Sequence, residues 1–84
     1  MTGGKPAFSY DERWIVFHQY TGNNSDLYLM DLRTGTPIKI TNMKAGQYAL
    51  FPHFRSDGWI YADVRDTNSN LEYLIASDAA LLNE

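Results

Sequence analysis

The 84-residue chain contains no cysteine, which excludes disulfide bonds and thiolate metal sites. It has no apolar run of the roughly 18 residues that a membrane-spanning helix needs, and residues 1–5 lack the apolar core of a signal peptide. Seven basic against ten acidic residues, a net charge of −3, leave no positive excess for binding nucleic acid. These absences predict no nucleic-acid partner, no membrane partner and, by default, a cytoplasmic location.

The patterns of common catalytic and metal sites are also missing. Ser9 and Ser56 do not stand in a nucleophile-elbow sequence, and there is no glycine-rich phosphate loop. A metal site needs several converging ligands, which His18 and His53 do not supply. Residues 66–72 begin like a calcium loop but lack its glycine and its final glutamate. We therefore expect no enzymatic activity, no cofactor and no bound metal.

The chain does contain an internal repeat. Pro6 and Pro52 lie 46 positions apart, whereas Trp14 and Trp59 lie 45 apart because the second copy drops one residue between them. Periods of this length are typical of repeat architectures in which each repeat is one supersecondary unit. We expect a single domain of two such units (domain 1–84, first unit 5–46, second unit 47–84).

Each unit is expected to form antiparallel strands, because its apolar segments are rich in aromatic and β-branched residues and are separated by turn formers. A tail of good helix formers behind Ser77 or Asp78 allows a short terminal helix. Asp11 and Asp57 recur in the repeat, which favours turn capping over acid–base chemistry. The expected strands are 6–8, 14–20, 26–32 and 37–41 in the first unit and 48–54, 59–65 and 71–76 in the second.

The strands of the first unit are apolar on both faces at residues 14–17 and 27–30, which is typical of strands covered on both sides. With two units, each has only one neighbour, so one face of each should stay open and carry apolar side chains. The sequence leaves the choice of face undecided. The alternatives are Trp14/Val16 or Ile15/Phe17 in the first unit, and Trp59/Tyr61 or Ile60/Ala62 in the second.

These residues resemble the TolB-like (WD40-like) β-propeller repeat family. The first copy reads PAFSYDE at 6–12, WIVF at 14–17 and DLYLMD at 26–31, and the second reads PHFRSDG at 52–58 and YLI at 73–75. The resemblance implies an all-β fold of antiparallel propeller-type blades, about two repeats in this chain. The first blade would have four strands. The second would have three, or be completed by another segment, because Ala76 and Ser77 replace the Met-Asp ending.

The resemblance also implies a non-enzymatic module for protein–protein binding or assembly. Two alternatives remain open: a fragment of an enzyme-associated propeller, either a hydrolase or a polysaccharide lyase, and a small self-assembling protein of unknown activity. The expected partners are other copies of the chain, docked through blade faces or the sheet edge, or another protein. If the chain is part of a TolB-like parent, its location would be periplasmic.

Residues that do not recur are better candidates for binding, because a purely structural role should be shared by both units. No catalytic, cofactor or metal residue is expected among them. The candidate binding surface comprises His18, Gln19, Tyr20, His53, Arg55, Asp63 and Arg65.

Overall fold

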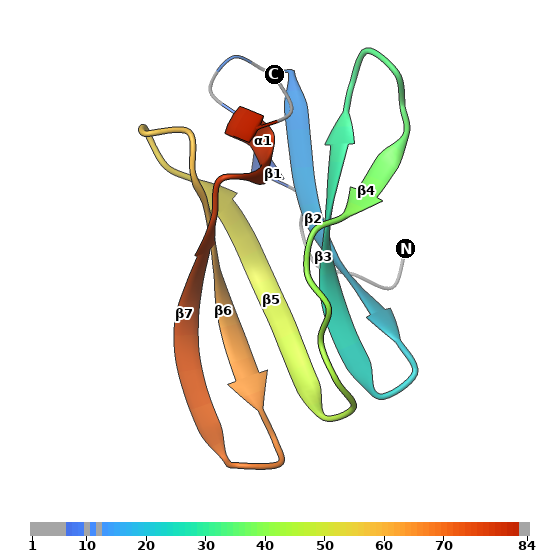
Figure 1. The fold of residues 1–84 in the computed structure, drawn as a ribbon, viewed down its shortest axis with the longest axis vertical. Coiled ribbons are helices and arrows are strands. Elements are labelled where there is room, and N and C mark those ends of the chain that lie inside the picture. Colours follow the sequence, from blue (N-terminus) through green and yellow to red (C-terminus); the bar gives the residue numbers. More distant parts are fainter. Residues whose placement is uncertain (1–6, 10, 12, 83–84) are drawn as a thin grey trace.

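The structure, a computed structural model, describes residues 7–9, 11 and 13–82. It is all-β with one short terminal helix, as the sequence predicts (Figure 1). No helix in this described part of the chain is long and apolar enough to cross a membrane. Parts of the expected elements fall outside the described residues: Pro6 at the start of the first strand, residues 10 and 12 between the first two strands, and residues 83–84 of the helical tail.

The first unit is a four-stranded antiparallel sheet, as predicted. The strands β1 (Ala7–Phe8), β2 (Trp14–Thr21), β3 (Asn24–Asp31) and β4 (Pro37–Lys39) pair in that order. The β2–β3 hairpin is tighter than the expected loop 21–25, because only Gly22 and Asn23 separate the strands. Gly22 has a φ of 67°, a conformation that glycine adopts without steric cost.

The second unit has three antiparallel strands, β5 (Gln47–Phe54), β6 (Ile60–Asp66) and β7 (Leu71–Ser77). The β5–β6 register shifts between Leu50 and His53, and Phe51 at this bulge has a φ of 53°. The helix α1 (Ala79–Leu82) follows. Within the described residues no fourth strand covers the outer edge of β7, so the predicted three-stranded second unit is confirmed.

The two units are joined through β3 and β5. A parallel bridge between Ser25 and Tyr48 connects them, so the strands form one seven-stranded sheet with β4 on the side of β3. The Ser25 hydroxyl, fully buried, donates to the Ala49 carbonyl at 2.8 Å. Hydrogen bonds therefore fix the second unit beside the first in addition to apolar packing.

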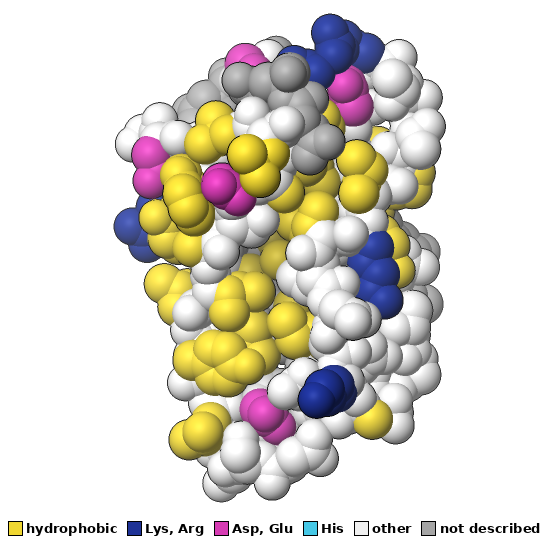
Figure 2. All heavy atoms as spheres, in the orientation of Figure 1, with side chains coloured by type: hydrophobic (Ala, Val, Ile, Leu, Met, Phe, Trp, Pro, Cys, Tyr) yellow, Lys and Arg dark blue, Asp and Glu magenta, His cyan; other side chains and the backbone are white. Residues whose placement is uncertain are grey.

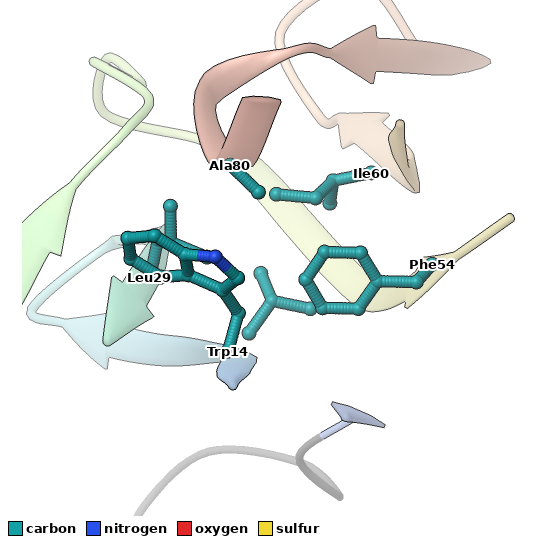
Figure 3. Close-up of a cluster of buried hydrophobic side chains, with 6 residues drawn as sticks. Trp14, Leu29, Phe54, Ile60 and Ala80 are labelled. Carbon is teal, nitrogen blue, oxygen red and sulfur yellow. The ribbon is translucent and has the colours of Figure 1, made fainter. Parts of the chain in front are cut away.

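Apolar side chains from both units meet in two clusters. The first cluster also takes in α1, whose Ala80 is 3% exposed and faces the strands (Figure 3). The residues of the first cluster are Trp14, Val16, Leu29, Phe54, Ile60 and Ala80, and those of the second are Leu27, Ala49, Ala62 and Val64. The core is thus the junction between the units.

The two units bury opposite faces of equivalent strands. Trp14 is 2% exposed, whereas its repeat equivalent Trp59 is half-buried; Ile60 is 1% exposed, whereas its equivalent Ile15 is half-buried. Because successive side chains of a strand point to opposite faces, the Trp14 side of the first unit packs on the Ile60 side of the second. The units are stacked head to tail. This outcome leaves the Ile15 and Trp59 sides open.

The repeated aspartates cap equivalent turns, as predicted. The Asp11 carboxylate accepts the backbone N–H of Arg13 at 3.1 Å, and the Asp57 carboxylate accepts that of Trp59 at 2.9 Å. In both turns the aspartate holds the amide two residues ahead of it, where the second strand of the unit begins. Such local bonds stabilise a turn against alternative backbone conformations.

Replacing Asp57 with alanine should lower the free energy of unfolding by about 0.5–2 kcal/mol, by analogy with helix N-caps that lose their side-chain acceptor. Asp57→Asn is the matched control, because the amide oxygen still accepts the Trp59 N–H. Urea unfolding measures both variants. An alanine variant as stable as the parent would remove the capping role.

Candidate binding surface

The structure distributes the seven predicted binding residues over three places. His18 is 1% exposed and lies inside the junction, so it is not part of an accessible surface. Gln19 and Tyr20 are exposed at the end of β2. His53, Arg55, Asp63 and Arg65 are exposed on the second unit. The predicted set is therefore not one surface: four members lie on β5, β6 and the turn between them, and the other three are consecutive on β2, where the His18 and Tyr20 rings are in contact.

The open side of the second unit, which we call the second outer face, comprises Trp59, Tyr61, Asp63 and Arg65 with His53 and Leu74 of the neighbouring strands. Tyr61 lies at its centre: the His53 ring stacks on it at 6.2 Å between centroids, and the Arg55 guanidinium lies 4.5 Å from its ring centre. Arg65 pairs with Glu72 at 3.2 Å. This face combines aromatic area with charged groups of both signs, a composition suited to a protein partner.

The open side of the first unit, the first outer face, comprises Ile15, Phe17, Tyr28 and Met30. Ile15 pairs with Met30 and Phe17 with Tyr28 across the β2–β3 hairpin. The Phe17 and Tyr28 rings are stacked, with centroids 5.7 Å apart. All four side chains are half-buried. This face is more apolar than the second outer face.

His18 holds the β5 bulge. Its Nδ1 accepts the backbone N–H of Phe51 at 3.1 Å, and the rings of Phe51 and Tyr20 approach it edge-on at 5.5 Å. Burial lowers the pKa of His18 below its ordinary value. His53 approaches the same bulge, with its Nδ1 3.4 Å from the Phe51 carbonyl oxygen. The two histidines thus lie on either side of one strained residue.

This arrangement predicts a pH-dependent stability. In the folded state the pKa of His18 lies below its unfolded value of 6.5, so the unfolded chain binds a proton more readily. The free energy of unfolding should be constant above about pH 6.5 and should fall as the pH decreases toward the lowered pKa. Urea unfolding between pH 5 and 8 measures this. His18→Asn, which keeps an acceptor without a titrating ring, should flatten the profile.

A buried carboxylate ties the connecting segment to β3. Asp26 is fully buried, and its Oδ1 accepts the Thr41 hydroxyl at 2.7 Å and the Met43 N–H at 2.8 Å. Its Oδ2 accepts the Asn24 amide at 3.1 Å and pairs with the Lys39 ammonium at 3.4 Å. Nothing in the sequence analysis indicated this cluster, since Leu71 stands at the equivalent position of the second unit.

A second carboxylate holds the β3–β4 turn. Asp31 accepts the backbone and side-chain N–H groups of Arg33, and the Arg13 guanidinium approaches at 3.3 Å. Hydrogen bonds from Arg33, followed by one from Arg13, lower the pKa of Asp31 to about 2. Asp31 is therefore ionised at neutral pH, and both arginine side chains pair with it.

The loop that resembles the start of a calcium site has another role. The Asp66 carboxylate accepts the Gln47 amide and the backbone N–H of Asn68, and these hydrogen bonds lower its pKa. Asn68 and Thr67 in turn bond to the carbonyls of Ala45 and Gly46. The acidic side chain thus fastens the β6–β7 loop to the segment before β5. No group of three acidic or histidine side chains in the described residues is arranged to hold a metal ion.

No family model and no solved structure matches the chain. Curated relatives that do match are proteins named Tol-Pal system protein TolB, from Francisella tularensis subsp. mediasiatica (strain FSC147) and from F. tularensis subsp. holarctica (strains OSU18 and LVS). Each is 36% identical over 53 residues, which cover 63% of this chain. The chain matches only 12% of the length of each relative. It is similar to a short part of TolB.

Proposed function

We propose that the chain is a non-enzymatic β-propeller-type module for protein–protein binding or assembly, built as one domain from the repeat units 5–46 and 47–84. One observation carries the proposal: equivalent strands of the two units bury opposite faces. The similarity to part of TolB supports the same class of module. For a longer TolB-like parent chain we propose a periplasmic location.

Because the units are stacked head to tail, each outer face is equivalent, by the repeat, to a face that the other unit covers. The second outer face, with Trp59, is equivalent to the Trp14 side that the second unit covers. The first outer face, with Ile15, is equivalent to the Ile60 side that the first unit covers. A further unit of the same kind therefore fits either face by repeating the contact inside this chain. That unit is supplied by a second copy or by another repeat-containing protein.

The edge of β7 adds a second surface for association. On this strand Leu71, Tyr73 and Leu74 are 58%, 44% and 54% exposed, and Figure 2 shows apolar side chains gathered over the β5–β7 half of the molecule. An unpaired strand edge offers backbone donors and acceptors to another strand. Contiguous exposed apolar patches on soluble proteins usually mark interaction sites. We propose His53, Arg55, Asp63 and Arg65 as polar contacts on the second outer face, where Asp63 and Arg65 lie on β6, the strand next to β7.

Light scattering coupled to size exclusion at micromolar concentration tests the assembly. We expect a mass that is a multiple of 9.6 kDa, with closed rotational symmetry because head-to-tail contacts of one kind form rings when they close. Trp59→Lys should shift the mass to that of a monomer. Leu82→Lys is the matched control, because Leu82 is 75% exposed and lies off both outer faces. If the unsubstituted chain were monomeric at this concentration, the result would contradict self-assembly.

A further inference from the structure

A cavity of about 160 Å³ opens where the turns of the two units meet α1. Its lining includes apolar side chains from Phe54, Ala80 and Leu81. It also includes hydroxyl groups and a carboxylate from the two capped turns. The lining residues are Ser9, Asp11, Trp14, Phe54, Ser56, Gly58, Ala80 and Leu81. None of these is a lysine or arginine, so the cavity does not favour an anion.

Trp14, which is one of the residues lining this cavity, carries an unsatisfied donor. The side chain is 2% exposed, and within the described structure its indole N–H has no hydrogen-bond partner. Figure 3 shows the nitrogen edge of the ring turned toward the side where Phe54 and Ala80 lie. A buried donor without a partner lowers stability by the full loss of its hydration, which is why such groups are rare in native proteins. The N–H therefore marks a place for an acceptor.

The polar groups at the cavity complement that donor. Asp11 accepts the Ser9 hydroxyl, and this hydrogen bond lowers the pKa of Asp11 so that its carboxylate remains an acceptor at neutral pH. Ser56 supplies a further hydroxyl from the equivalent turn of the second unit. A ligand hydroxyl can accept one hydrogen bond and donate another. A hydroxyl group thus satisfies the Trp14 N–H and an acceptor of the turns together.

We propose that this cavity binds a phenolic ring, with the ring against Phe54, Ala80 and Leu81 and the hydroxyl on the Trp14 N–H. The size agrees, since an apolar cavity of roughly 150 Å³ holds a benzene ring. The phenol belongs either to a free small molecule or to a tyrosine side chain of a bound peptide. The site lies between the two units of one chain, so it does not depend on self-assembly.

Titration of the ¹⁵N-labelled chain with phenol tests the site through its two tryptophan indole signals. We expect a saturable shift of the Trp14 signal and no matching shift of the Trp59 signal, which serves as the internal control. Benzene should bind about fivefold more weakly, the factor that one net neutral hydrogen bond provides. Equal binding of phenol and benzene, or equal shifts of both indole signals, would overturn the proposal.

Two further arms sharpen the test. N-acetyl-tyrosinamide binding as tightly as phenol would identify a peptide tyrosine as the source of the ring, and binding of phenol alone would identify a small molecule. Trp14→Phe should abolish the preference for phenol over benzene. Because that variant can lose stability, Ser56→Ala provides a second variant at an exposed position. It should weaken the affinity for phenol and leave the affinity for benzene unchanged. If a folded Trp14→Phe variant preferred phenol over benzene by the same factor as the unsubstituted chain, the assignment would be wrong.

Discussion

Alanine in place of Trp14 is expected to lower the free energy of unfolding by about 3–5 kcal/mol, the range for removing a large aromatic side chain from a core. Trp14 packs against Leu29, Phe54 and Ala80 in the cluster that joins the units. The loss would leave a void between them that α1 cannot fill. For a chain of this size, total stability is of the order of 0.05–0.15 kcal/mol per residue. For 84 residues this amounts to about 4–13 kcal/mol, so the substitution should remove a large part of the total stability.

The chain contains its own matched control for this variant. Trp59 occupies the equivalent position of the repeat but is half-buried on the second outer face. Trp59→Ala should lower the free energy of unfolding by about 1 kcal/mol or less at concentrations where the chain is monomeric, since partly exposed positions contribute little. Urea unfolding of both variants followed by circular dichroism measures the difference. Equal losses would contradict the head-to-tail stacking of the units.

The existence and order of the strands could be predicted from the sequence because local chemistry determines them. Aromatic and β-branched segments form strands, and the repeated aspartates mark the turns. The β2–β3 loop was predicted too long because Thr21 and Asn24 have the composition of a loop. In the structure they end the ladder, and the Thr21 hydroxyl donates to the Asn24 side chain at 2.9 Å. A polar pair thus extends the hairpin where propensity alone predicts its end.

The choice of buried face could not be predicted, because β2 is apolar on both sides. Ile15 and Val16 are similar in chemistry, and only the position of the second unit decides that Val16 is fully buried and Ile15 half-buried. The repeat does contain the relevant signal. If equivalent residues keep the same orientation in each unit, two stacked units must bury opposite faces, which reduces the choice to Trp14 with Ile60 or Ile15 with Trp59.

The candidate site illustrates a limit of the argument from non-recurring residues. His18 does not recur, yet it is buried and accepts a hydrogen bond from Phe51 of the other unit. A residue that joins two units differs between them for a structural reason, since the first unit has no partner on its other side. Failure to recur therefore marks contacts between units as well as surfaces for binding. Asp26 also fails to recur for a structural reason, because it is buried and holds the segment that leads to the second unit.

Asp26→Ala is expected to be the most destabilising change of a polar residue in the chain. The substitution leaves the Met43 N–H and the Thr41 hydroxyl without their acceptor, and it removes the partner of Lys39. Hydrogen bonds to a charged group contribute about 1.5–3 kcal/mol each, so losing those to Asp26 should lower stability by several kcal/mol, although the exposed Lys39 ammonium can be solvated. These partners lie on β4 and the segment that leads to β5. Loss of Asp26 should therefore release the connection between the two units as well as weaken β3.

Three comparisons separate this role from a general effect of charge. Thr41→Val removes the hydroxyl that donates to Asp26 and accepts the Leu27 N–H, so two hydrogen bonds are lost and the free energy of unfolding should fall by about 1–3 kcal/mol. Asp26→Asn keeps one acceptor oxygen and should fall between Thr41→Val and Asp26→Ala. Asp63→Ala, at an exposed position on β6, should change stability by no more than about 0.5 kcal/mol. Urea unfolding at pH 7 measures all four variants. If Asp26→Ala were no less stable than Asp63→Ala, the buried carboxylate would not hold the connecting segment, and apolar packing alone would fix the units together.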